Sequence, residues 1–140
     1  MNRLDTPALA ATLLRLSLGL ILVAHALLKL FVFTLPGTAA FFESQGFPGW
    51  SAYPVVAIEG IGGLVMIAGY QVRLAALASI PVLLGALSVH LGNGWLFTAK
   101  NGGWEYPALL VVLAVAVALL GEGAFAVGAR RGAALRVATA

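Results

Sequence analysis

The sequence predicts an all-α fold, an integral membrane four-helix bundle. Three observations lead to this prediction: 61% of the 140 residues are hydrophobic, only 9% are charged, and the mean hydropathy is +1.02. An average soluble domain carries roughly 25% charged residues, so the chain has too few charges to cover a surface exposed to water. The 17 glycines fit a chain dissolved in lipid, where small residues let helices pack closely. A soluble globular domain is therefore excluded.

Four apolar stretches separated by turn signals are close to the length that a bilayer core requires, which is about 20 residues. Glycine or proline clusters divide them, such as Pro36-Gly37 after the first and Gly92-Asn93-Gly94 after the third. We treat residues 1–140 as one membrane domain, with predicted spans over 8–35, 53–70, 74–91 and 105–120 and a basic C-terminal tail over 124–140.

The third and the first predicted spans each have an unusual feature. Pro81 lies inside the third span, where it is expected to kink the helix rather than end it, because membrane helices tolerate proline. The first span is longer than a bilayer needs, so it either tilts or leaves the membrane early, near Lys29. The amphipathic piece over 38–45 can lie on the membrane surface as a half-helix.

The distribution of basic residues predicts the orientation. Four spans place both termini and the turn over 71–73 on one side, which carries five arginines, whereas the loops over 36–52 and 92–104 carry only Lys100. The positive-inside rule then puts both termini in the cytoplasm and makes the chain a multi-pass protein of the inner (plasma) membrane. An aromatic belt is expected at the outer interface: Trp50, Tyr53, Trp95, Trp104 and Tyr106. The basic residues form no stripe, which argues against nucleic acid as a partner.

Ionisable residues inside or at the edge of the spans are the candidate site. A charge at mid-depth costs on the order of 2.5–3.5 kcal/mol, so these side chains should face the bundle interior and pair. Five of them are expected to converge on the outer half of the bundle, and Arg15 alone lies toward the cytoplasmic end. The six are Arg15, His25, Lys29, Glu59, His90 and Glu105.

The sequence is consistent with two roles for Lys29 and Glu59. They can form a structural ion pair that offsets two desolvation costs and fixes the register of the helices. Alternatively they orient a ligand oxygen in a polar pocket open to the outer leaflet, where His25 or His90 exchanges protons near neutral pH. Arg15 is expected either to extend toward the cytoplasmic interface or to pair with Glu122.

Other chemistry is limited by what the sequence lacks. It has no cysteine, which excludes disulfides, thiolate metal sites and a thiol redox couple within the chain. The histidines and glutamates show no metal-ligand spacing, so no metal is predicted. Phosphate-loop, nucleophile and zinc-protease motifs are also absent. Any redox chemistry therefore needs a bound cofactor or another subunit. Glycines over 60–69 thin one side of the second span, either for close helix packing or to admit a flat ring or isoprenoid tail.

Five motifs in order resemble the DoxX family of small four-helix membrane proteins. They cover about residues 10–125, nearly the whole chain. They are Arg15…Leu18-Gly19…His25…Lys29-Leu30, Phe41-Phe42-Glu43-Ser44-Gln45-Gly46-Phe47-Pro48, Glu59-Gly60-Ile61-Gly62-Gly63-Leu64, Gly69-Tyr70-Gln71-Val72-Arg73-Leu74-Ala75-Ala76 and Asn101-Gly102-Gly103-Trp104-Glu105-Tyr106.

The resemblance implies four helices and a link to membrane redox, because the namesake subunits belong to thiosulfate:quinone oxidoreductase. The motif positions that carry over are Arg15, Lys29, Glu59 and Glu105, the first three of them on the first two spans. Combined with the burial argument, this gives Lys29, Glu59 and His25 as candidate catalytic residues. The candidate ligand-binding residues are Arg15, His90, Glu105 and Trp104.

Three functions compete. The first is a quinone-contacting subunit of an oxidoreductase, in which a redox partner subunit supplies the electron-donating site. The second is a non-enzymatic anchor or assembly partner for another protein. The third is a small transporter, for which four helices are few but a dimer could suffice. We favour the first, in a bilayer, with quinone as the cofactor and with the chain in a homo-oligomer or a hetero-complex. Whether the chain has enzymatic activity of its own is left open.

Overall fold

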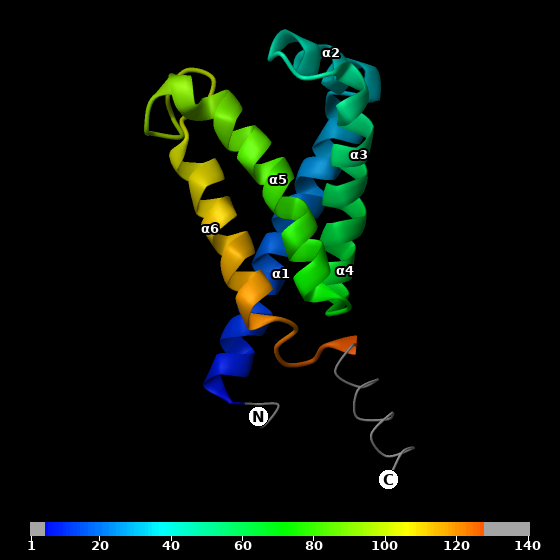
Figure 1. Cartoon of the computed structure of the whole chain (residues 1–140), viewed down its shortest axis with the longest axis vertical. Helices are drawn as coiled ribbons and strands as arrows, with labels where there is room; N and C mark the ends of the chain where they lie inside the picture. The colour runs from blue at the N-terminus through cyan, green and yellow to red at the C-terminus, as the bar shows by residue number, and fades with distance from the viewer. Residues whose placement is uncertain (1–4, 128–140) are drawn as a thin grey trace.

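The computed structural model describes residues 5–127, and every regular element in that range is helical (Figure 1). The all-α prediction is therefore confirmed. The elements are α1 (Thr6–Leu27), η1 (Leu28–Val32), α2 (Leu35–Ser44), η2 (Gly49–Ser51), α3 (Ala52–Ala57), η3 (Ile58–Gly62), α4 (Gly63–Ala68), α5 (Val72–His90), η4 (Leu91–Asn93) and α6 (Glu105–Leu120).

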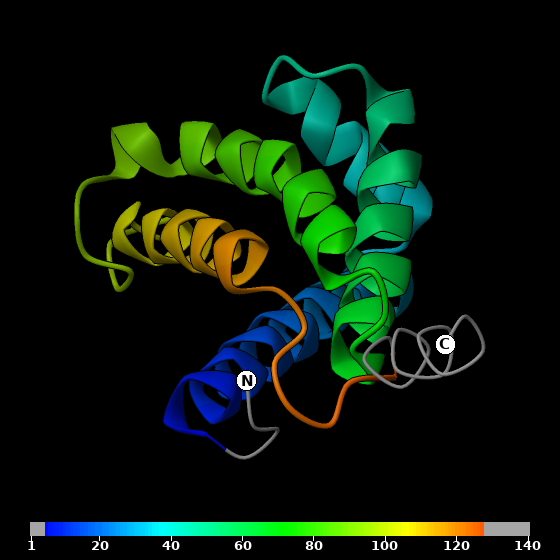
Figure 2. The same cartoon turned by 60° about the horizontal axis from the view of Figure 1, so that its bottom comes forward.

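These elements join into four columns. Three columns are long and apolar enough to cross a membrane, over Thr6–Val32, Gly49–Ala68 and Val72–Asn93. The fourth, α6, has the predicted bounds, but its 16 residues extend only about 24 Å at 1.5 Å per residue. Figure 2 shows α6 running alongside α5. The chain is thus a membrane helical bundle with three full-length columns and one shorter one.

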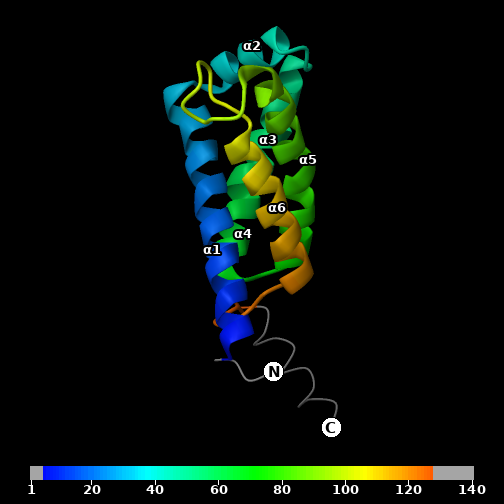
Figure 3. The same ribbon diagram turned by 90° about the vertical axis from the view of Figure 1, so that its left-hand side faces the viewer.

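The two ends of the bundle differ. The start of α1 and the segment after α6 lie together at one end, which we call the terminal end (Figures 1 and 3). The Ala124 N–H donates to the Ala8 carbonyl (3.1 Å) and the Thr12 hydroxyl donates to the Ala124 carbonyl (2.9 Å). The opposite end, which we call the loop end, carries α2 and residues 94–104. Because the number of columns is even, the first and last described segments lie at the same end of the bundle. Most of the predicted basic tail, over 128–140, lies outside the described residues.

The first predicted span ends earlier than expected. Its helix stops at Val32, and Pro36 does not close it but lies in the first turn of α2. Proline suits that position because the first turn of a helix needs no N–H donor. Thr34 (φ 63°) makes the turn and caps α2 by accepting from the Gly37 N–H (3.3 Å). The predicted surface half-helix over 38–45 is therefore the later part of a helix that begins at Leu35.

Smaller differences occur in the next two spans. The second column begins at Gly49, four residues before the prediction, and ends at Ala68 because Gly69 adopts a left-handed conformation (φ 73°). Tyr70, the predicted last residue, lies beyond that end. The helix α5 runs without interruption through Pro81 from Val72 to His90.

The core lies mainly in the half of the bundle nearer the terminal end. There α1 crosses α4 at Gly19 and Gly63, whose backbones approach so closely that a Cβ on either would lie within 2.8 Å of the other's carbonyl oxygen. Large side chains fill the space around this crossing, with Leu18, Leu22 and Met66 fully buried. At Gly63 the glycine face of the second span thus serves close helix packing.

Arg15 is buried at this end, and the prediction that it pairs with Glu122 needs correction. Its guanidinium donates to backbone carbonyls only: to Glu122 (2.7 Å), Met66 (2.7 Å), Ile67 (2.7 Å) and Ala124 (3.1 Å). The guanidinium has five N–H donors in a fixed fork, and the last carbonyls of α4 have lone pairs left to accept them, although that of Met66 also accepts from the Gly69 N–H (3.0 Å). Arg15 is therefore a connector between α1, α4 and the segment after α6.

Replacing Gly63 by alanine should loosen the bundle, because the new methyl group would overlap the Gly19 backbone. We expect a loss of about 1–3 kcal/mol in the free energy of unfolding, the usual cost of overpacking. Gly62→Ala is the matched control, since a Cβ at Gly62 meets no atom within 4 Å. Unfolding in a detergent titration, followed by circular dichroism, measures both. Equal stability of the two variants would contradict the crossing.

Candidate functional site

A cavity of about 1120 Å³ opens among α1, α2, α3, α5 and α6 in the half of the bundle nearer the loop end. Small-molecule sites commonly measure about 300–1,000 Å³, so the cavity is large enough for a small-molecule ligand. Its floor is apolar and includes Leu22, Leu83 and Leu110 of the core. The polar side chains that line it are His25, Lys29, Gln45, Ser51, Glu59, His90, Trp95, Glu105 and Tyr106.

The two charged residues at the centre of this wall both lie on π-helical turns. Lys29 belongs to η1 and Glu59 belongs to η3, which interrupt two otherwise α-helical columns. A π-turn inserts one residue into a helix and rotates the side chains that follow, and such turns are frequent at functional sites. The two distortions therefore occur where the ion-pair partners must face each other.

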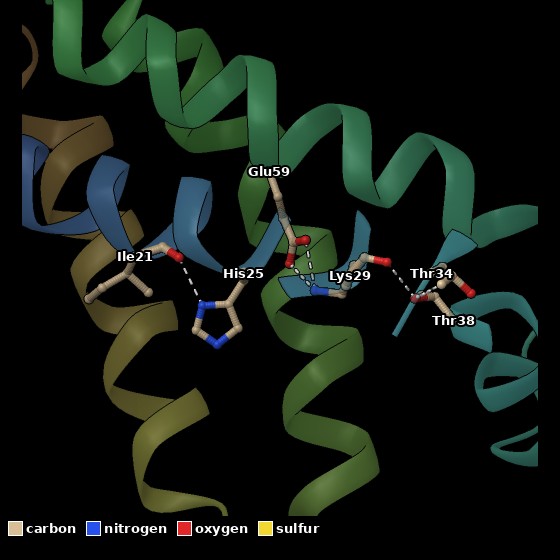
Figure 4. A network of polar contacts seen from close by, with 6 residues as sticks. All are labelled: Ile21, His25, Lys29, Thr34, Thr38 and Glu59. Carbon is tan, nitrogen blue, oxygen red and sulfur yellow. Dashed lines mark hydrogen bonds and ion pairs between the residues drawn. The ribbon is translucent and has the colours of Figure 1, made fainter. Parts of the chain in front are cut away.

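Lys29 and Glu59 form a symmetric ion pair (Figure 4). The Nζ atom lies 2.7 Å from both Oε1 and Oε2, and the side chains are 17% and 6% exposed. An ammonium group has three N–H donors, so Lys29 keeps one for another acceptor. The pair joins α1, through η1, to the second column. The Lys29 carbonyl also accepts from the Thr38 hydroxyl (3.4 Å), which ties the start of α2 to the same place.

The two histidines of the cavity share one local arrangement. Nδ1 of His25 lies 2.8 Å from the Ile21 carbonyl, and Nδ1 of His90 lies 2.7 Å from the Ala86 carbonyl. A carbonyl oxygen only accepts, so each Nδ1 carries the proton. Nε2 of a neutral imidazole is then an acceptor. In Figure 4 the second ring nitrogen of His25 points away from its own helix. Within residues 5–127 neither Nε2 atom has a hydrogen-bond partner.

Glu105 lies where the 94–104 loop enters α6. Its Oε1 accepts from the Phe97 N–H (2.8 Å), and its carboxylate stands in the first turn of α6, where a helix favours negative charge. The loop is tightly folded: a Cβ at Gly103 would collide with the carbonyl oxygen of Leu96. One oxygen of Glu105 therefore stabilises the loop at the rim of the cavity.

The structure brings five of the seven predicted site residues to the cavity wall: His25, Lys29, Glu59, His90 and Glu105. Arg15 is not among them, because it is bound to carbonyls near the terminal end. Trp104 does not line the cavity either, since its ring packs edge-on against Trp95 (centroids 4.5 Å apart). The roles given to these residues remain predictions.

Several lining residues were not predicted from sequence. Phe41, Phe42 and Gln45 reach the cavity from α2, and Tyr106 stacks beside His25 with ring centroids 6.4 Å apart. Two signals were available for the α2 residues: the amphipathic pattern over 38–45, and the motif over 41–48 that resembles the DoxX family. Among residues 5–127, no three His, Cys, Asp or Glu side chains stand close enough to hold a metal ion.

Comparison with known proteins gives the family. The DoxX family model matches residues 10–92, more than half of the chain. The chain belongs to the DoxX family. The match includes Arg15, Lys29 and Glu59, while Glu105 lies beyond it. The resemblance drawn from the motifs is thereby confirmed.

A curated relative in Bacillus subtilis (strain 168) is named "Putative oxidoreductase CatD". It is 33% identical over 111 residues, which are 79% of this chain and 78% of the relative. No solved structure matches the chain.

Breaking the ion pair from one side should cost more than removing both charges. Lys29→Met leaves a buried carboxylate without its cation, and Glu59→Gln leaves the ammonium, so each should lower the free energy of unfolding by about 3 kcal/mol. The double variant Lys29→Met/Glu59→Gln should lose less than the sum, with a coupling of about 1–3 kcal/mol. Detergent-induced unfolding of all four proteins measures this cycle. Strictly additive losses would show that the pair is not coupled.

Proposed function

We propose that this DoxX-family protein is a quinone-contacting membrane subunit of an oxidoreductase complex, and that the cavity is where the quinone ring lies. The observation that carries the proposal is the composition of the cavity wall. An unused N–H of Lys29 and the Nε2 atoms of His25 and His90 line one apolar space within a membrane bundle.

The cavity suits a lipid-soluble ligand with a small polar ring. Leu22, Leu83 and Leu110 on the floor, together with Phe41 and Phe42 from α2, offer apolar contacts for a ring and for the beginning of a tail. The polar groups lie nearer the loop end, about one to two helical turns from the floor along α1. A ligand would thus place its oxygens toward the loop end and its apolar part toward the bilayer centre.

Orientation supports the same function. In the orientation that the arginine distribution predicts, the terminal end lies in the cytoplasm and the loop end lies at the outer face of the inner membrane. A partner that delivers electrons from outside would meet the ligand at the loop end. Since the chain has no cysteine, it offers no thiol couple of its own, and the electron-donating site belongs to the partner subunit. The name of the Bacillus subtilis relative, a putative oxidoreductase, is consistent with a redox role.

Mass spectrometry of lipids, quinones and proteins retained after purification in mild detergent tests the proposal. We expect retained quinone, and an at least roughly tenfold lower retention in Lys29→Met/Glu59→Gln, which corresponds to about 1.4 kcal/mol of binding free energy. The control is Lys100→Met/Glu43→Gln, which makes the same chemical changes at two exposed residues outside the cavity.

Two results would contradict the proposal. Equal quinone retention by the two double variants would show that the quinone does not bind in the cavity. A stoichiometric protein partner with no quinone would favour the anchor function, and reduce Lys29 and Glu59 to a structural pair.

A further inference from the structure

We infer that the cavity distinguishes the two redox forms of its ligand and binds the hydroquinone more tightly than the quinone. The inference rests on the proposed function, because it assumes that a quinone-type ligand enters the cavity. It follows from the hydrogen-bonding capacity that the cavity side chains have left after their internal bonds are counted.

The histidines supply acceptors. The carbonyls of Ile21 and Ala86 fix the proton of each imidazole on Nδ1, at 2.8 and 2.7 Å. Each neutral ring therefore presents the lone pair of Nε2, and both rings line the cavity. Gly102 of the loop lies beside the His90 ring, since a Cβ there would be 3.3 Å from Cδ2 and 3.5 Å from Nε2. Neither ring can offer a donor unless it gains a proton or gives up its helix carbonyl.

Lys29 supplies a donor. Two of its three N–H groups are directed to the two oxygens of Glu59, so one N–H is left for a ligand oxygen. The Ser51 hydroxyl is already directed to the Pro48 carbonyl (2.6 Å), and the Glu105 carboxylate only accepts when ionised. Gln45, Trp95 and Tyr106 also line the cavity and carry N–H or O–H groups, so Lys29 is one of several donors. Among the acceptors are the Nε2 atoms of His25 and His90, which have no partner within residues 5–127.

Only the hydroquinone can donate a hydrogen bond to these two imidazoles. A quinone oxygen is a pure acceptor, so it can bond to Lys29 but cannot pair with the histidine lone pairs, which lose contact with water when the ring covers them. A hydroquinone oxygen accepts and donates, so it can accept from Lys29 and donate to an imidazole. Leaving a buried polar atom without its partner is costly, and sites built for a hydroxyl reject analogues that lack it. The hydroquinone should therefore bind at least roughly tenfold more tightly.

Binding of three probes to the full chain in nanodiscs tests the inference: a decyl-substituted benzoquinone, its hydroquinone, and the dimethyl ether of that hydroquinone. The ether has oxygens but no O–H donor and cannot be oxidised to the quinone. Measurements are made without oxygen at pH 8, where histidine side chains are ordinarily neutral. We expect the hydroquinone to bind at least about tenfold more tightly than either other probe, by the unpaired-acceptor argument.

The variant His25→Phe keeps a ring beside Tyr106 but removes the acceptor. It should lose about tenfold in hydroquinone affinity while quinone affinity stays nearly unchanged, and His90→Phe measures the second imidazole in the same way. Lys100→Met is the control, and an unchanged unfolding transition shows that each variant is folded.

The outcomes separate the inference from the proposed function. Quinone binding as tight as hydroquinone binding would overturn the inference and leave the proposed function standing. An equal loss for all three probes in both histidine variants would overturn the role of the imidazoles as hydroxyl acceptors. Failure of every probe to bind would overturn the proposed function and the inference together.

Discussion

The ion pair between Lys29 and Glu59 is the interaction on which the rest of the cavity depends. Both charges lie in apolar columns, and neither could remain there alone at a modest cost. Two 2.7 Å hydrogen bonds satisfy both carboxylate oxygens and hold the second column against the first. The Thr38 hydroxyl of α2, which donates to the Thr34 carbonyl at 2.9 Å, also lies 3.4 Å from the Lys29 carbonyl, so α2 contacts the backbone beside the ion pair. The wall of the cavity is therefore built around one electrostatic contact.

The two halves of the bundle differ in packing: one is close-packed and the other contains the cavity. Near the terminal end, the Gly19–Gly63 crossing and the Arg15 hydrogen bonds draw α1, α4 and the segment after α6 together. Near the loop end, α5 and α6 diverge from the first two columns, as Figure 1 shows. Polar side chains gather in that half, around the cavity. A close-packed end fixes the columns, and this allows the other half to keep an open, partly polar space inside a membrane bundle.

The sequence was sufficient for features that depend on composition and spacing. Long apolar stretches gave the helical columns, and the cost of burying a charge gave the pairing of Lys29 with Glu59. The convergence of His25 and His90 on the same half followed from the same argument and the rise of a helix. These inferences need no tertiary coordinates, because the bilayer itself restricts where charges and helices can lie.

Other features depend on backbone geometry that the sequence does not display. The π-turns at Lys29 and Glu59 have no residue signature, since they arise from fitting one column to another. Pro36 stops one helix in many contexts, yet here it begins the next, because Thr34 makes a left-handed turn before it. Arg15 was expected either to extend toward the cytoplasmic interface or to pair with Glu122, but backbone carbonyls near the end of α4 accept its hydrogen bonds instead.

Photo-crosslinking with an azido-quinone, followed by peptide mass spectrometry, tests the central claim of a ligand site at the loop end most directly. The account predicts label on the cavity-lining residues of α1 and α5, around His25 and His90, and competition by unlabelled quinone. Label confined to lipid-facing residues such as Leu13 or Leu119, or to the terminal end around Arg15, would contradict it.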